Sequence, residues 1–118
     1  MGKNKENYLD YIPKHNSLYE FSSNQNNHIE IRVPNKGLFN RIAQLVFKRP
    51  KFSNIELDEF GSFVWESIDG KSSIYEVGIR VKERFGEKVE PLYERLAHFI
   101  KTLHNNEFIV YVNKINKK

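Results

Sequence analysis

Residues 57–109 read LDEFGSFVWESIDGKSSIYEVGIRVKERFGEKVEPLYERLAHFIKTLHNNEFI. Apolar residues recur in this stretch at intervals of three and four, the spacing of one face of a helix. Clean start and stop signals divide it into three short amphipathic helices. No catalytic constellation is embedded in these helices, so the stretch favours a protein that holds something over one that transforms it.

Capping residues set the boundaries of the three helices. Asp58 is a good N-cap for the first helix, and Gly70 can take the left-handed conformation that ends it. Ser73 and Glu76 form a capping box at the start of the second helix. Pro91 suits the first turn of the third, where an N–H is not needed. The predicted apolar stripes are Phe60, Phe63, Val64 and Ile68, then Ile74, Val77, Val81 and Phe85, then Leu92, Leu96, Phe99, Ile100 and Leu103.

Strands are predicted on both sides of the helices. Residues 17–21 and 28–33 look like two strands joined by the turn-like connector SSNQNN, which predicts a hairpin. The second of them alternates apolar and charged residues, the mark of a half-buried strand. A third strand is predicted over 52–57 and a short final one over 108–112.

The composition limits the kinds of protein and of site that the chain can form. The chain has 118 residues, enough for one domain with a modest core. It has no cysteine, which excludes disulfides, thiolate metal sites and cysteine nucleophiles. The net charge of +4, from 19 basic and 15 acidic residues, does not by itself argue for nucleic acid. No apolar run approaches the ~20 residues of a membrane helix, so we expect no membrane span and a cytoplasmic protein.

The predicted fold class is α+β. It combines a three-helix bundle resembling a winged helix-turn-helix, a small N-terminal antiparallel sheet and an inserted amphipathic basic helix. We expect a flexible N-terminal segment over 1–16, a single domain over 17–112 with the insert at 35–51, and a basic tail over 113–118.

No catalytic, metal or cofactor site is expected. None of the four histidines has metal-ligand spacing with another ligand. Asp58, Glu59 and Asp69 could suggest acid–base chemistry, but helix capping explains them better. Trp65 lies off the main stripe of the first helix, and we expect it to pack in the core.

Two short motifs and their order carry a resemblance. The first helix fits L-[DN]-E-x-x-x-x-[IVW]-W, and the next turn and helix fit D-G-x-x-[ST]-[IV]-x-E-[IVL]. The matching residues are Leu57, Asp58, Glu59, Val64, Trp65, Asp69, Gly70, Ser73, Ile74, Glu76 and Val77. With the third helix and the Phe108-Ile109 pair that follows it, the chain resembles the PqqD family over roughly residues 17–112. These are small winged-helix proteins that recognise precursor peptides.

The resemblance implies a non-catalytic peptide chaperone. Family members bind the leader of a ribosomally made peptide and present it to a modifying enzyme, often a radical SAM protein. The leader adds as a strand to the third β-strand and lies against the third helix. Carried onto this chain, the peptide-binding residues would be Phe52, Ser53, Asn54, Ile55 and Leu57 of the strand and Leu92, Arg95, Leu96, Phe99 and Leu103 of the helix.

The chain departs from the family pattern at 35–51, where compact members have a short turn. This insert could cover the peptide groove, extend it or dock the partner enzyme; the cations assigned to docking are Arg41, Lys48, Arg49 and Lys51. A basic rim of Lys48, Arg49, Lys51 and Arg95 would favour an acidic leader. The open edge strand could also pair with its own copy in a homodimer.

Two other functions stay open at this point. The helices could form a DNA-binding winged-helix regulator whose third helix enters the major groove. Glu87, Glu90 and Glu94 at that end should repel phosphate, so nucleic acid is not the expected partner. The chain could also be an adaptor that docks one protein and never meets a precursor peptide.

Overall fold

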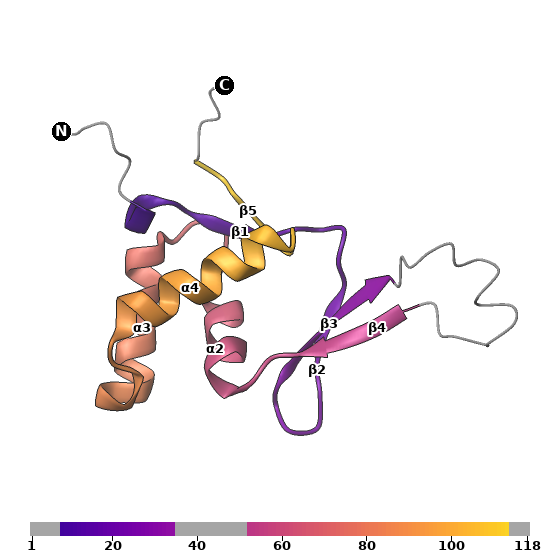
Figure 1. Cartoon of the computed structure of the whole chain (residues 1–118), viewed down its shortest axis with the longest axis horizontal. Coiled ribbons are helices and arrows are strands. Elements are labelled where there is room, and N and C mark those ends of the chain that lie inside the picture. The colour runs from indigo at the N-terminus through magenta and orange to yellow at the C-terminus, as the bar shows by residue number, and fades with distance from the viewer. Residues whose placement is uncertain (1–7, 35–51, 114–118) are drawn as a thin grey trace, which may run out of the picture. The chain divides into compact units, whose positions relative to one another are not determined.

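The computed structural model describes residues 8–34 and 52–113 of the chain (Figure 1). The described chain is α+β, as predicted, with three α-helices and small antiparallel sheets. In chain order the elements are η1 (Tyr8–Asp10), β1 (Pro13–His15), β2 (Phe21–Ser23), β3 (Ile29–Pro34), β4 (Phe52–Glu56), α2 (Glu59–Ser67), α3 (Ile74–Phe85), η2 (Gly86–Val89), α4 (Leu92–Asn105) and β5 (Ile109–Tyr111). The predicted basic helix within 35–51 lies outside the described residues.

The described residues form two compact units. The helical unit contains residues 8–16 and 63–113, and the sheet unit contains residues 17–34 and 52–62. The boundary between them falls inside α2. Whether they act as the single domain predicted over 17–112 stays a prediction.

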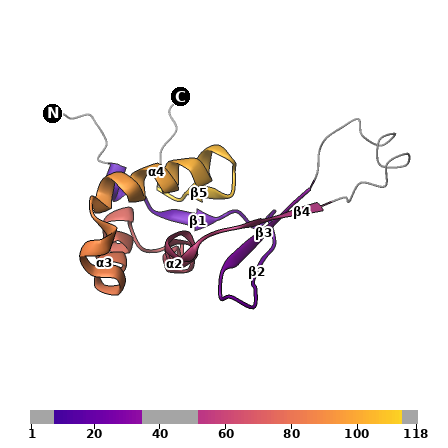
Figure 2. The same cartoon turned by 60° about the horizontal axis from the view of Figure 1, so that its bottom comes forward.

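The sheet unit is a three-stranded antiparallel sheet with the strand order β2-β3-β4 (Figure 2). The hairpin between β2 and β3 is confirmed, and Asn24 shapes its turn. The side-chain oxygen of Asn24 accepts hydrogen bonds from the backbone N–H groups of Asn26 at 2.8 Å and His28 at 3.1 Å. Asn27 adopts a left-handed φ of 63°, which asparagine tolerates better than most residues.

The predicted position of the first hairpin strand, residues 17–21, is wrong. The observed strand β2 begins at Phe21, and residues 17–19 form a turn and bend instead. The tight turn sets the position of the strand. The Asn24 N–H donates to the carbonyl of His28 at 2.8 Å. This bond closes the hairpin immediately after Ser23, so the strand lies nearer the turn than composition suggested.

Ser62 closes the ladder between β3 and β4 at its buried end. Its Oγ accepts a hydrogen bond from the Ile29 N–H at 2.8 Å and donates one to the Leu57 carbonyl at 3.1 Å. The hydroxyl therefore bridges two backbone groups that would otherwise lose their partners as β4 turns into α2. Asp58 then caps α2, as predicted, with Oδ1 accepting from the Gly61 N–H at 2.8 Å.

The helical unit contains a second sheet, in which β1 pairs antiparallel with β5. The final strand was predicted, but β1 was not. Residues 8–16 belong to the segment that was expected to be flexible, and in the structure backbone hydrogen bonds tie them to distant segments. The Ile74 N–H donates to Tyr11 O at 2.9 Å, and the Val112 N–H donates to Ile12 O at 2.8 Å.

Aromatic contacts reinforce this N-terminal segment. The hydroxyls of Tyr8 and Tyr111 lie 2.8 Å apart, and the Tyr11 ring is 4.8 Å from that of Tyr111. Burial and this hydrogen bond raise the pKa of Tyr8. The His15 ring stacks on Trp65 at 4.1 Å, and its Nε2 lies 2.8 Å from the Trp65 carbonyl oxygen.

The core of the helical unit follows the predicted apolar stripes closely. Its buried apolar side chains are Val64, Trp65, Ile68, Ile74, Val77, Val81, Val89, Leu92, Leu96, Ile100, Leu103, Phe108 and Ile109. The predicted core positions Phe63, Phe85 and Phe99 are only partly buried. Trp65 is buried, which confirms its expected core role.

The predicted capping box of α3 is confirmed. The Ser73 hydroxyl accepts from the Glu76 N–H at 3.1 Å, and the Glu76 carboxylate accepts from the Ser73 N–H at 2.9 Å. In the turn before it, Asp69 accepts hydrogen bonds from the backbone N–H groups of Lys71 and Ser72, which hold its pKa below the usual value. Both carboxylates are thus structural. Across residues 8–34 and 52–113, no helix is long and apolar enough to cross a membrane.

Candidate functional site

Strand β4 is an edge strand of the sheet unit. Of the described strands, β3 alone pairs with it, in the register that sets Ile31 opposite Ile55 and Arg32 opposite Asn54. Figure 2 shows β4 lying along β3 with β2 on the other side of β3. An edge strand presents backbone donors and acceptors to a further strand.

Two backbone hydrogen bonds fix which residues of β4 face outward. The Leu57 N–H donates to Ile29 O at 2.8 Å, so Leu57 faces β3. The Arg32 N–H donates to Glu20 O at 2.9 Å, so Arg32 faces β2 and away from β4. Since the backbone groups of successive residues point to opposite sides along an antiparallel strand, those of Ile55 point toward β3, as the Leu57 N–H does.

The outward-facing residues of β4 are therefore Phe52, Asn54 and Glu56. Their N–H and C=O groups point away from β3, at the alternating spacing that an added strand requires. The sequence pattern predicts the strand. It does not show which backbone groups face β3 and which face outward, because that depends on the pairing with β3.

The apolar face of the sheet ends in an exposed isoleucine. Phe21, Ile31 and Ile55 form one row across the three strands. Ile31 is fully buried, whereas Ile55 retains 40% of its surface and Phe21 retains 43%. The row therefore continues to the β4 edge with apolar surface that another side chain could cover.

The polar face of β4 is acidic. Glu30 and Glu56 stand directly opposite each other on β3 and β4. The Asn24 amide donates to both carboxylates, at 2.8 Å and 3.0 Å, and His28 Nδ1 lies 2.9 Å from Glu56 Oε2. The hydrogen bonds from Asn24 and His28 lower the pKa of Glu56.

Next to this acidic pair lies a row with balanced charges. Arg32 is 3.9 Å from the Glu20 carboxylate, and Asn54 donates to Glu30 at 3.3 Å. These side chains border a shallow pocket of about 180 Å³ on the same face. Sequence reasoning missed these polar residues, since the register that brings Glu30 to Glu56 is not visible before the strands are paired.

The predicted helix-face residues divide into two groups. Leu92, Leu96 and Leu103 are buried in the core, with 5%, 0% and 3% of their surface exposed. Arg95 is exposed and Phe99 is partly exposed. As peptide contacts all five stay predictions, and only Arg95 and Phe99 have appreciable solvent-exposed surface.

Several predicted site residues cannot be placed. Phe52 is the first residue of β4, and the structure describes its backbone only. The cations assigned to partner docking, which are Arg41, Lys48, Arg49 and Lys51, lie outside the described residues.

The N-terminal end of α4 is held by acidic side chains. Glu90 accepts a hydrogen bond from the Leu92 N–H at 3.0 Å and pairs with Lys82, which lowers the pKa of Glu90. The Arg95 guanidinium donates to the Lys88 carbonyl at 3.3 Å. Nothing in this arrangement favours the DNA-binding alternative, because the carboxylates lie where a recognition helix would meet phosphate.

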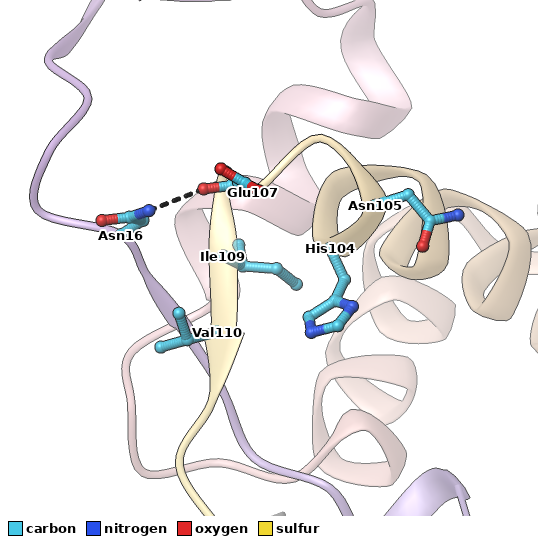
Figure 3. A pocket seen from close by; sticks show the side chains of 6 residues that line it. All are labelled: Asn16, His104, Asn105, Glu107, Ile109 and Val110. Atoms are coloured by element: carbon cyan, nitrogen blue, oxygen red, sulfur yellow. Dashed lines mark hydrogen bonds between the residues drawn. The ribbon is translucent and has the colours of Figure 1, made fainter.

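The helical unit has an open pocket of about 480 Å³ where α4 ends beside β5 (Figure 3). It is lined by Asn16, His104, Asn105, Glu107, Ile109 and Val110. The Asn16 amide donates to the Glu107 carbonyl at 2.7 Å, and the His104 ring stacks on Tyr111 at 4.3 Å. These contacts hold the lining in place, and the lining contains no pairing of a nucleophile with a base.

Within residues 8–34 and 52–113, no group of three or more His, Asp or Glu side chains is placed to hold a metal ion.

The comparison with models of known protein families gives a match over the second half of the chain. The family model described as Coenzyme PQQ synthesis protein D (PqqD) matches residues 50–109, a stretch that begins just before β4 and ends in β5. No curated protein matches the chain, and no solved structure matches it.

Proposed function

This chain belongs to the PqqD family, and we propose that it is a non-catalytic peptide chaperone. It binds the leader of a ribosomally made precursor peptide and presents that peptide to a modifying enzyme, such as a radical SAM protein. Proteins of the family take part in the synthesis of coenzyme PQQ and of related peptide products. A winged-helix arrangement of the three helices is part of the same proposal.

The observation that supports this function best is the outward direction of the Asn54 and Glu56 backbone groups on an edge strand. Strand addition obtains affinity from main-chain hydrogen bonds and specificity from alternate side chains. The strand β4 offers both, because Ile55 presents apolar surface between two residues whose backbone groups face outward.

Proline scanning of the sheet edges tests the proposal. Binders are first selected on the full-length chain from a random library of ten-residue peptides. Their affinities are then measured for Asn54→Pro, which removes an outward donor, and for Ser23→Pro. Ser23 is the matched control, since it lies at an outward-facing position of the opposite edge strand, β2. Asn54→Ala removes the side chain but keeps the backbone donor.

We expect Asn54→Pro to weaken peptide binding about tenfold or more, the effect of losing a hydrogen bond and of crowding the edge. Ser23→Pro should bind like the parent, and Asn54→Ala should lie much closer to the parent than to the proline variant. Circular dichroism establishes that each variant is folded. If folded Asn54→Pro binds the selected peptides as tightly as the parent, strand addition at β4 is wrong.

A further inference from the structure

We infer that the peptide strand that pairs with β4 carries a lysine or arginine opposite Glu56 and an apolar residue opposite Ile55. This inference rests on the proposed function and adds the class of peptide that the edge selects. It follows from the composition of the three rows of side chains that cross the sheet to the β4 edge.

The rows differ in how their charges are balanced. One row contains Glu20, Arg32 and Asn54, in which the arginine lies 3.9 Å from the glutamate. The adjacent polar row contains Ser22, Glu30 and Glu56. Within residues 8–34 and 52–113, no lysine or arginine forms an ion pair with either of these two carboxylates.

Like charges directly opposite each other destabilise a pair of strands. Here the Asn24 amide relieves the repulsion by donating to both Glu30 and Glu56. Its orientation is fixed, because its oxygen already accepts the turn amides of Asn26 and His28. Asn24 supplies hydrogen bonds but no charge, and the imidazole of His28 supplies charge only when it is protonated.

An added strand would meet this row at its open end. Glu56 is an outward-facing residue, so the residue opposite it would exchange backbone hydrogen bonds with it and lie on the same face of the sheet. The Glu56 side chain is 47% exposed. Both of its hydrogen bonds within the described chain go to Oε2. A peptide lysine or arginine opposite Glu56 would supply positive charge to the row that contains Glu30 and Glu56.

The neighbouring peptide residue would stand opposite Ile55. Residues in such non-hydrogen-bonded pairs have the shortest separation between strands, which favours apolar side chains in contact. An apolar residue there would extend the row of Phe21, Ile31 and Ile55 and cover the exposed part of Ile55.

This charge preference differs from the one expected from sequence. The predicted basic rim favoured an acidic leader, but Lys48, Arg49 and Lys51 lie outside the described residues. The described part of β4 carries the opposite sign, so the local preference opposite Glu56 is cationic even where other parts of the peptide are acidic.

The test compares peptides selected on the full-length parent, on Glu56→Gln and on Glu56→Lys from the same random ten-residue library. We expect the parent to enrich lysine or arginine at one position beside an apolar position. Changing Glu56 to Gln should weaken those binders roughly two- to fivefold, the range for one cross-strand charge pair. The Glu56→Lys selection should enrich aspartate or glutamate at the same position and keep the apolar one. The charge effect should shrink at high salt, because exposed charges are screened.

Two failures can be told apart with Asn54→Pro. If the selected peptides lose binding to Asn54→Pro but show no cation and bind Glu56→Gln as well as the parent, this inference is wrong and the proposed function stands. If their binding is indifferent to Asn54→Pro, strand addition itself fails and the inference fails with it.

Discussion

The two sheets of this protein use the same antiparallel pairing to different ends. In the helical unit, β5 pairs with β1 and buries Ile109, of which 1% is exposed. In the sheet unit, β4 pairs with β3 and leaves 40% of Ile55 exposed. The first strand buries its apolar side chain, whereas the second retains exposed apolar surface and outward backbone groups, where we propose that a peptide strand binds.

The ends of both strands are held by long-range backbone bonds. At β5 these run from the Asn16 N–H to Phe108 O at 2.9 Å and from the Val112 N–H to Ile12 O at 2.8 Å. At β4 the Leu57 N–H donates to Ile29 O at 2.8 Å, and the Ser62 hydroxyl bridges the Ile29 N–H and the Leu57 carbonyl. Because the outward N–H groups of β4 point away from β3, we expect substitutions at those positions to affect binding more than stability.

The largest expected difference is between two isoleucines. We predict that Ile109→Ala lowers the free energy of unfolding by about 2–5 kcal/mol, because it removes a fully buried side chain and leaves a cavity. Ile55→Ala, the matched change on a side chain that is 40% exposed, should cost about 1–1.5 kcal/mol. Urea denaturation of both variants measures these values. Equal losses would mean that β4 is as much part of the stable core as β5.

A second contrast lies within β4. We predict that Ile55→Pro destabilises the protein by about 1–3 kcal/mol, since it removes an inward N–H and leaves a buried acceptor on β3 unpaired. Asn54→Pro should cost less than about 1 kcal/mol, because its N–H faces outward, a position where edge strands accept proline. Thermal and urea unfolding compare the two. A larger loss for Asn54→Pro would reverse the assignment of inward and outward residues.

The capping box of α3 gives a smaller effect, confined to the helical unit. We predict that Ser73→Ala lowers stability by about 1 kcal/mol, the usual cost of losing an N-cap side chain. Ser22→Ala, an exposed serine of β2 whose side chain caps no helix, is the control and should be nearly neutral. Matching losses for both serines would count against the capping bond.

The smallest predicted effect is the pH dependence contributed by His15. Burial lowers the pKa of His15 below its ordinary value of 6.5. The unfolded chain therefore takes up a proton before the folded chain does as the pH falls. The stability that neutral His15 contributes is fully present above pH 6.5. It is lost as the pH falls from 6.5 toward the pKa of His15 in the folded chain. Unfolding curves between pH 8 and 5 should show a shallower loss for His15→Gln than for the parent. An unchanged pH slope would contradict this role.

Local signals predicted most of the helical fold. The caps at Asp58, Ser73 and Glu76 were visible because each depends on residues a few positions apart. The apolar stripes were visible for the same reason. Trp65 was harder to place, since its burial beside His15 depends on a strand about fifty residues away.

The pairing between strands that are distant in the sequence could not be predicted. Residues 13–15 read Pro-Lys-His and show no alternating pattern, yet they form β1 with β5 nearly a hundred residues later. The acidic row has the same origin, because Glu30 and Glu56 meet only through the register of β3 and β4. At the candidate site, the strand and Ile55 were predictable, but the direction of each backbone group was not.

Amide hydrogen exchange of the full-length chain, with and without a selected peptide, tests strand addition at β4 most directly. We predict that the peptide slows exchange at Asn54 and Glu56. It should leave Ser23, on the opposite edge, unchanged, and Ile55 should differ little because its N–H already faces β3. Slowed exchange at Ile109 and Tyr111 of β5, with Asn54 and Glu56 unchanged, would contradict this prediction.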